Sequence, residues 1–130
     1  MRGKTPAVIA ALAVFALTWA GSANPVQRPQ AVPKEQNQPK IEGTLVEGTS
    51  IKTDNGTWTN SPTNYRYRWQ RCTGNSASSC TDISGADGVA YTLRDEDVGR
   101  RMRIFVTACN ADGCSTPANS QISADRKSVV

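Results

Sequence analysis

The segment that most constrains the fold is residues 65–72, where aromatic and polar side chains alternate. Successive side chains of a β-strand point to opposite faces of a sheet, so Tyr65, Tyr67 and Trp69 would share one face. The other face would carry Arg66, Arg68, Gln70 and Cys72. A strand with one apolar and one polar face is typical of an antiparallel sheet covered on one side. We therefore expect a central strand of a β-sandwich, with Tyr67 and Trp69 in the core rather than on a sugar-stacking surface.

A second alternating segment, residues 101–109, predicts the other central strand. Its inward side chains would be Met102, Ile104, Val106 and Ala108, and its outward ones Arg101, Arg103, Phe105, Thr107 and Cys109. Short runs elsewhere end at regularly spaced turn residues, which favours an all-β sandwich. Asn55 and Gly56 suit a tight turn, which accounts for them better than a glycosylation triplet ending at Thr57. Residues 114–122 are expected to form an edge strand that tolerates Pro117.

The segments outside this pattern divide the chain. An apolar run over residues 7–20 follows Arg2 and Lys4 and precedes a small-residue site, which predicts a signal peptide over residues 1–23. About 14 apolar residues are too few for a transmembrane anchor, which needs about 20. Residues 24–38, rich in proline and glutamine, are expected to be a disordered linker, either a spacer or a passive end. The domain would span residues 39–124 and a C-terminal tail residues 125–130.

Composition excludes several classes of function. The formal net charge is +4, but without Arg2 and Lys4 only 13 basic and 11 acidic side chains remain, too even a balance for a nucleic-acid binder. The chain has no histidine, so the commonest general base and metal ligand is missing. Asp95, Glu96 and Asp97 in succession match no calcium loop closely. We predict no enzyme activity, no catalytic residue, no metal site and no cofactor.

The order of these pieces resembles an immunoglobulin-like module of bacterial secreted and cell-surface proteins, of the actinobacterial type. The resemblance runs from Pro39 to about Ala124 and rests on short motifs spread over the domain: Ile41 to Gly43 with Gly48, Gly56 to Trp58, Tyr67 to Cys72, Cys80 to Ile83, Tyr91 to Leu93, Asp97 to Gly99, and Val106 to Ala108 with Asn110 and Gly113. It implies an all-β antiparallel β-sandwich. It also implies departures from antibody domains, because no cysteine lies near Ile51 and Arg101 stands where the tyrosine corner would place tyrosine.

Four cysteines allow three disulfide connectivities. In such a sandwich Cys72 and Cys109 end antiparallel neighbours at opposite ends of the domain. If those strands pair centre to centre, Cys72 lies beside Met102 and roughly 23 Å from Cys109, too far for a disulfide. Cys80 follows Cys72 and Cys114 follows Cys109, each by one loop. We therefore predict the pairs Cys72 with Cys80 and Cys109 with Cys114.

The predicted strand pairing brings outward side chains together on one face: Arg66, Arg68, Gln70, Arg101, Arg103 and Phe105. The guanidinium fork suits carboxylates and phosphates, so this face could bind anionic or carbohydrate ligands. An ordinary solvated sheet face is the alternative. We expect a secreted, non-catalytic binding or adhesion module, with a cell-wall carbohydrate or another surface or secreted protein as partner and with no nucleic acid. The competing hypothesis is a ligand-free accessory domain tethered through its proline-rich arm.

Overall fold

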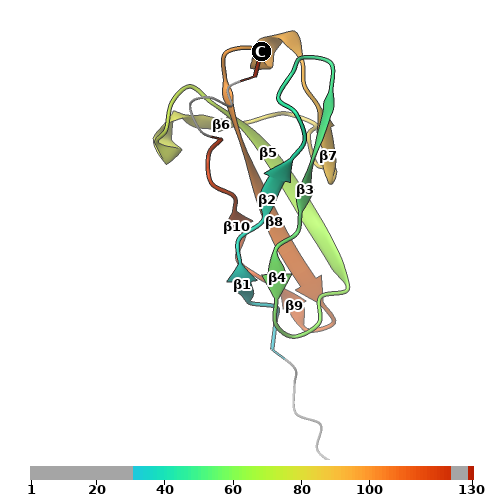
Figure 1. The fold of residues 1–130 in the computed structure, drawn as a ribbon. Coiled ribbons are helices and arrows are strands. Elements are labelled where there is room, and N and C mark those ends of the chain that lie inside the picture. Colours follow the sequence, from blue (N-terminus) through green and yellow to red (C-terminus); the bar gives the residue numbers. More distant parts are fainter. Residues whose placement is uncertain (1–30, 124–128) are drawn as a thin grey trace, which may run out of the picture.

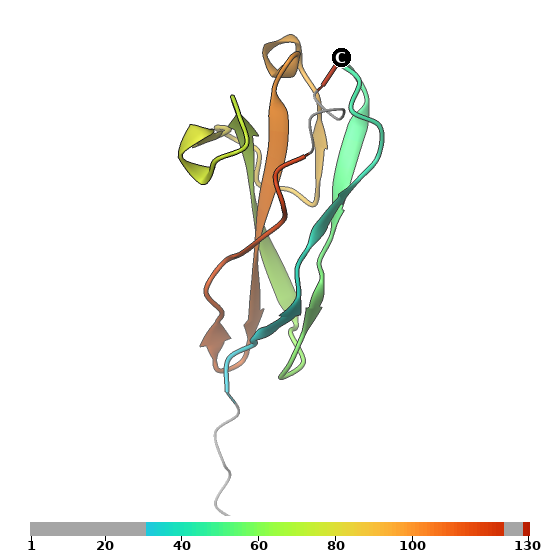
Figure 2. The ribbon, with the colours of Figure 1, turned by 60° about the vertical axis from the view of Figure 1, so that its left-hand side comes forward.

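The computed structural model describes residues 31–123 and 129–130, which form a β-sandwich elongated along its strands (Figure 1). One sheet has the order β2 (Lys40–Glu42), β3 (Ser50–Asp54), β7 (Ala90–Thr92). The other has the order β10 (Ala118–Asn119), β8 (Arg101–Asn110), β5 (Asn64–Cys72), β6 (Cys80–Asp82), and β9 (Gly113–Cys114) also pairs with β8. Figure 2 shows the two layers nearly edge-on. Two short 3-10 helices, η1 (Ala77–Ser79) and η2 (Asp95–Asp97), lie in the connections.

The two predicted central strands, β5 and β8, pair antiparallel over their whole length. Their register runs from Asn64 opposite Cys109 to Cys72 opposite Arg101. The expected pairing of Cys72 with Met102 is therefore wrong by one residue, because Met102 lies opposite Arg71. This shift changes no distance by more than one residue rise, so Cys72 and Cys109 still lie too far apart for a disulfide. Cys72–Cys80 and Cys109–Cys114 are confirmed, and they account for every cysteine of the chain.

The core lies between the two sheets, where the inward side chains of β5 and β8 meet those of β3 and β7. Trp69, Met102, Ile104 and Val106 are all 0% exposed. The ring of Trp69 stacks on that of Tyr91 at 5.9 Å between centroids, and its Nε1 donates to the Gly88 carbonyl at 2.9 Å. Tyr67, expected in the core, is only half-buried and packs against its margin. Burying these aromatic and branched side chains is the main favourable contribution to folding.

Asn55 and Gly56 do not form the expected hairpin turn. The chain continues in the same direction from β3 into β4 (Thr57–Trp58), and β4 pairs with β1 (Glu35–Asn37) (Figure 1). The ladder is interrupted where Pro39, which has no N–H group, faces this position. Gly56 adopts φ +72°, and a Cβ there would lie 2.3 Å from the Asn37 carbonyl oxygen. Close approach of the neighbouring strand, rather than a turn, therefore requires the glycine.

The segment predicted to be a disordered linker is part of the domain from residue 31 onward. Pro33 and Pro39 are fully buried. Amide side chains hold the backbone of this segment: Asn110 Nδ2 donates to the Ala31 carbonyl and Asn60 Nδ2 to the Val32 carbonyl, both at 2.9 Å. The segment carries little apolar surface, which predicted disorder. Its contacts come instead from side-chain amides and from the pairing of β1 with β4. The predicted signal peptide and residues 24–30 lie outside the described residues.

The predicted C-terminal tail also contributes to the domain through its last two residues. Val129 is 1% exposed and belongs to the core cluster. Its carbonyl accepts from Gly99 N at 2.7 Å, and its own N–H donates to the Arg100 carbonyl at 2.9 Å. Val130 N donates to the Leu45 carbonyl at 3.0 Å. Residues 124–128 lie outside the described residues.

The final edge of the sandwich is held by serine side chains. The strand expected over residues 114–122 is split into β9 and β10, with Pro117 between them. Ser115, Ser120 and Ser123 each donate a backbone N–H to a β8 carbonyl and accept a β8 N–H on their hydroxyl oxygen. The β8 residues bound in this way are Ala108, Ile104 and Met102 respectively. Each serine thus satisfies both backbone groups of one β8 residue where a regular strand is absent.

Candidate binding face

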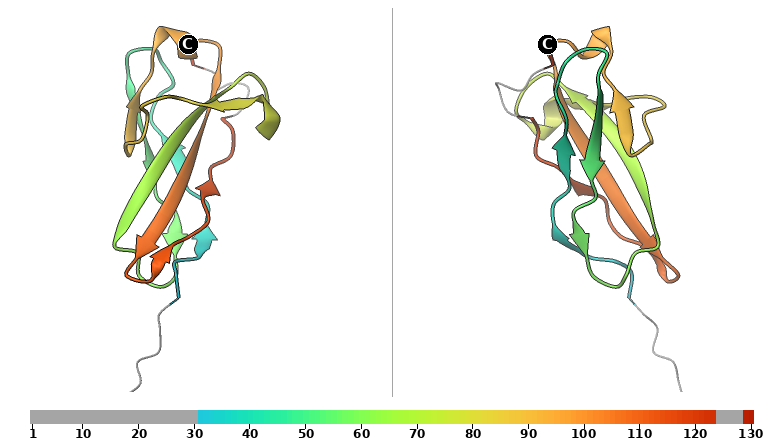
Figure 3. Two further views of the ribbon diagram at one scale, coloured as in Figure 1. Left: turned by 180° about the vertical axis from the view of Figure 1, so that it is seen from behind. Right: turned by 45° about the vertical axis from the view of Figure 1, so that its right-hand side comes forward.

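The outward side chains of β5 and β8 form one polar surface, which we call the arginine face. Directly opposite residues of an antiparallel pair lie on the same side of the sheet, so the register defines its rows. Arg66 lies opposite Thr107, Arg68 opposite Phe105, and Gln70 opposite both Arg103 and Asp82 of β6. The two strands run side by side across this side of the molecule (Figure 3, left). The sequence therefore predicted which residues this face brings together.

Phe105 is the centre of the face, because two guanidinium groups converge on its ring. The Cζ atom of Arg68 lies 4.4 Å from the ring centroid and that of Arg103 lies 4.7 Å away. A cation over an aromatic ring is attracted by the ring's quadrupole, by about 0.5–1 kcal/mol at exposed sites. Phe105 is half-buried, so its ring is covered largely by arginine rather than open to solvent. The ring brings two like charges close together.

Asp82, on the edge strand β6, is an acidic group that contacts Arg68 of this pair. Its Oδ1 lies 3.6 Å from Arg68 Nε and accepts a hydrogen bond from Gln70 Nε2 at 2.8 Å. The separation from Arg68 is too long for a good hydrogen bond, and both side chains are about half exposed, so this ion pair contributes little. Two buried atoms next to it, Gln70 Oε1 and Arg103 Nε, have no hydrogen-bond partner in the described part of the chain.

The two ends of the face differ. At one end, a hollow of roughly 230 Å³ is lined by Arg66, Arg68, Phe105, Thr107 and Pro117, together with Tyr67. At the other end, Arg101 hydrogen-bonds the Asn75 side chain in the loop before η1. The predicted site residue Arg101 is therefore engaged with its own domain. Arg66 and Arg68 are the exposed members of the set.

The sequence prediction missed a buried ionic network on the opposite side of β5. Asp97, in η2, is 0% exposed. It accepts hydrogen bonds from Arg71 Nε at 2.6 Å, from Tyr91 Oη at 2.7 Å and from the Arg94 N–H at 2.9 Å. Alternation along β5 could have indicated this network, because Arg71 lies on the same face of the strand as Trp69. Both carboxylate oxygens of Asp97 are occupied by these donors, so this acidic run does not present them to a cation.

Charge and burial in this network alter two pKa values. Burial and the hydrogen bond to Asp97 raise the pKa of Tyr91 to about 12, because both disfavour the phenolate. Burial opposes the charged form of Arg71, but the hydrogen bond to Asp97 and the negative charge of Asp97 outweigh it and raise the pKa of Arg71. The network therefore holds a neutral tyrosine and a charged arginine against a buried aspartate. It fixes the corner before β8 rather than forming a site open to ligands.

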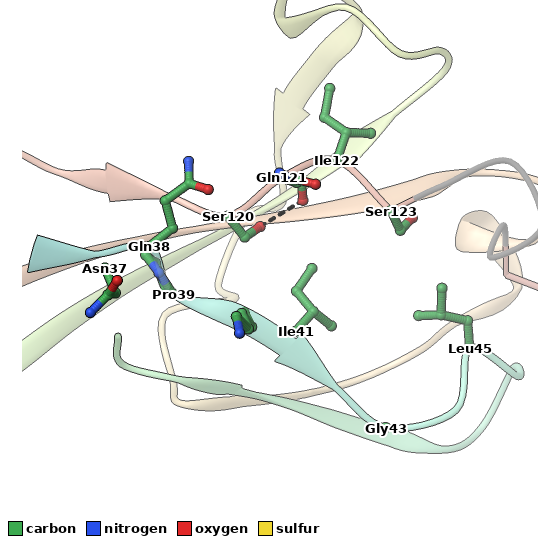
Figure 4. A pocket seen from close by; sticks show the side chains of 11 residues that line it. Asn37, Gln38, Pro39, Ile41, Gly43, Leu45, Ser120, Gln121, Ile122 and Ser123 are labelled. Carbon is green, nitrogen blue, oxygen red and sulfur yellow. Dashed lines mark hydrogen bonds between the residues drawn. The ribbon is translucent and has the colours of Figure 1, made fainter. Parts of the chain in front are cut away.

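A larger groove lies elsewhere, along the seam where the edges of the two sheets face each other (Figure 4). It measures roughly 570 Å³ and lies between β2 and the segment that follows β10. Ile41 and Leu45 point toward the segment after β10, whose residues Ser120, Ile122 and Ser123 line the other wall. Among the described residues, Lys40 is the one titratable residue in its lining. These lining residues include no paired acids and no nucleophile next to a base, the groups that acid–base or nucleophilic catalysis needs.

The comparisons with known proteins support the architecture. Residues 35–123 match the family model described as the AIR9 A9 domain, an immunoglobulin-like family. The chain belongs to this family. The match begins at β1, which agrees with the inclusion of residues 35–38 in the domain. No curated protein matches the chain. The bacterial origin implied by the earlier resemblance stays a prediction.

Membership of an immunoglobulin-like family indicates a binding or structural module, because this sandwich is typically non-catalytic. In residues 31–123 and 129–130, no group of three histidine, cysteine, aspartate or glutamate side chains is arranged to hold a metal ion. Among the same residues, no helix is long and apolar enough to cross a membrane.

Proposed function

We propose that this immunoglobulin-like domain is a non-catalytic binding module that acts outside the cell and holds an anionic ligand on its arginine face. The ligand belongs to a cell-wall carbohydrate or to another surface or secreted protein. The observation that carries the proposal is the convergence of Arg68 and Arg103 on the ring of Phe105. Side chains fixed before binding lose less entropy when the ligand arrives. Their N–H groups are suited to carboxylate or phosphate oxygens.

The alternative is a ligand-free structural domain, and the contact between Arg68 and Asp82 favours it to some degree, since part of the face is neutralised internally. The long separation and the exposure of both groups make that contact weak. Arg103 Nε and Gln70 Oε1, which have no partner among the described residues, favour binding, because buried polar atoms ordinarily have partners. We therefore place binding ahead of a purely structural role.

The proposed binding site is tested by reversing two charges. Cell-wall fractions or culture proteins that bind the parent are tested against the double variant R68E/R103E of the mature chain. The affinity should fall at least about tenfold, because charge-assisted hydrogen bonds become repulsive contacts. A matched control, K34E/K40E, changes the charge equally on exposed residues of the β1–β2 segment and should bind normally. The melting temperature reports that folding is intact. If R68E/R103E binds like the parent, the loops carry the ligand. If the parent itself binds no fraction, the structural alternative holds.

The extracellular part of the proposal rests on the signal peptide predicted over residues 1–23. Expression with the complete leader should release a protein whose first residue is Asn24. N-terminal sequencing of the culture medium measures this. Recovery of a chain that still begins at Met1 would remove the extracellular setting and leave the binding face as a separate claim.

A further inference from the structure

The register of β5 and β8 arranges arginines from two strands into a single line. Arg66 and Arg68 are neighbours on one face of β5. Phe105 lies opposite Arg68, so Arg103, two residues away along β8, is the diagonal neighbour of Arg68. We call Arg66, Arg68 and Arg103 the arginine track. It runs along β5 and crosses to β8 beside the ring of Phe105.

The backbone positions of this track are nearly evenly spaced. Residues two apart on one strand are separated by about 6.6–6.8 Å, and diagonal neighbours across an antiparallel pair by about 7–8 Å. An extended polypeptide has the same repeat, because every second side chain points the same way at about 6.6–6.8 Å. Acidic side chains at alternate positions of an extended peptide would therefore meet successive arginines of the track.

The other groups on the face favour a peptide over a sugar polymer. A sugar needs an open aromatic ring for stacking, but the Phe105 ring is covered by Arg68 and Arg103, and Trp69 is buried in the core. An acidic peptide binds through its carboxylates and needs no such ring.

Asp82 occupies the place of a ligand carboxylate next to this track. It contacts Arg68 and holds Gln70 through Nε2, although neither contact is buried. A carboxylate brought by a ligand would compete with it for Arg68 and would be repelled by it. Removing the charge of Asp82 should therefore strengthen binding, whereas removing an arginine of the track should weaken it.

From these observations we propose that the arginine track binds an extended acidic segment of a partner protein, with acidic side chains at alternate positions, and that Asp82 limits the affinity. The inference rests on the proposed function, since it names the ligand class for the same face. It adds a requirement for spacing, which a general attraction between opposite charges would not impose.

The test uses labelled octapeptides of one composition, with glutamate and serine either alternating or in two blocks, titrated into the mature chain at physiological salt. The alternating peptide should bind several-fold more tightly than the block peptide. R66Q and R103Q should each weaken it by about tenfold, since each removes a charge-assisted contact. D82N should strengthen it several-fold. K34Q serves as the control variant and should leave it unchanged.

Several outcomes would overturn the inference. Equal binding of the two peptides would show that spacing is not recognised, and no gain in D82N would remove the role of Asp82. If polygalacturonate or polyphosphate displaced the labelled alternating peptide at a lower concentration than the unlabelled peptide does, the face would be assigned to a different polymer. If neither peptide binds while cell-wall or culture fractions still bind in an Arg68-dependent way, this inference fails and the proposed function stands. Loss of both kinds of binding would overturn both.

Discussion

At the scale of single residues, the position of a side chain along a strand decides whether its charge is available. Arg68 and Arg71 lie three residues apart on β5 and therefore on opposite faces. Arg68 is about half exposed beside Phe105, whereas Arg71 is directed to buried Asp97. The same residue type thus serves a candidate binding surface in one position and an internal ion pair in the other.

The Asp97 network predicts a loss of stability in alkali. The pKa of Tyr91 rises from 10.0 to about 12 in the folded state, so the folded chain keeps a proton that the unfolded chain loses. The stabilisation by Tyr91 is therefore complete below pH 10 and is lost as the pH rises from 10 towards 12. The free energy of unfolding should fall by at most about 2–3 kcal/mol over this range. Urea unfolding of the parent and of Y91F between pH 9 and about 11.5 measures it.

In Y91F this part of the alkaline decline should be absent, although the variant starts from a lower stability because Asp97 loses one donor. Y67F, which removes a hydroxyl outside the network, should keep the parental decline. Parallel pH profiles for the parent and Y91F would contradict the assignment.

At the scale of elements, the last edge of the sandwich depends on serine hydroxyls rather than on a continuous ladder. Ser120 is the most buried of the three, at 2% exposure, and its Oγ accepts the Ile104 N–H at 3.1 Å. S120A would leave that N–H unpaired in the interior and should cost about 1–3 kcal/mol. S115A removes the same kind of bond at a half-buried position, where water can replace the hydroxyl, and should cost less.

Urea unfolding of S120A and S115A measures the difference. Equal losses in the two variants would show that burial does not decide the strength of the clamp, and no loss in S120A would show that the Ile104 N–H finds another partner. The m-value should stay at that of the parent, because neither change alters the surface exposed on unfolding.

The elements divide clearly into those the sequence could predict and those it could not. The central strands were predictable because apolar and polar side chains alternate along β5 and β8, and the same alternation predicted the members of the arginine face. The sequence did not predict three other features: the serine contacts to β8, the ladder interruption at Gly56 and the packing of residues 31–38 on the domain. Each depends on a partner distant in sequence, as Ser120 depends on Ile104 and Gly56 on Asn37, and no local pattern records such a partner. The hollow beside Arg66 likewise depends on where Pro117 lies.

At the scale of the whole molecule, the two disulfides act on one sheet. Cys72–Cys80 ties β5 to β6, and Cys109–Cys114 ties β8 to β9, at opposite ends of the central pair. Each closes a short loop, with sequence separations of 8 and 5. Chain entropy predicts about 2–3 kcal/mol for each, a large share of the stability of a small domain.

The double variants C72A/C80A and C109A/C114A should therefore each unfold at lower urea concentration, and the combined variant should lose close to the sum, because the bridges lie far apart. Non-reducing gels confirm that the remaining bridge is formed. A single double variant with parental stability would show that its bridge only joins strands already fixed by packing.

Because the first described residues and Val130 lie at opposite ends of the molecule (Figure 1), a pull between them would act along the strands. Force directed along paired strands loads their hydrogen bonds together, as in shear, and the pairs β1–β4 and β2–β3 would receive it at the N-terminal side. Both disulfides lie in the other sheet, outside those pairs. Mechanical resistance would therefore come first from hydrogen-bonded strands, and the covalent links would only limit how far the chain extends afterwards.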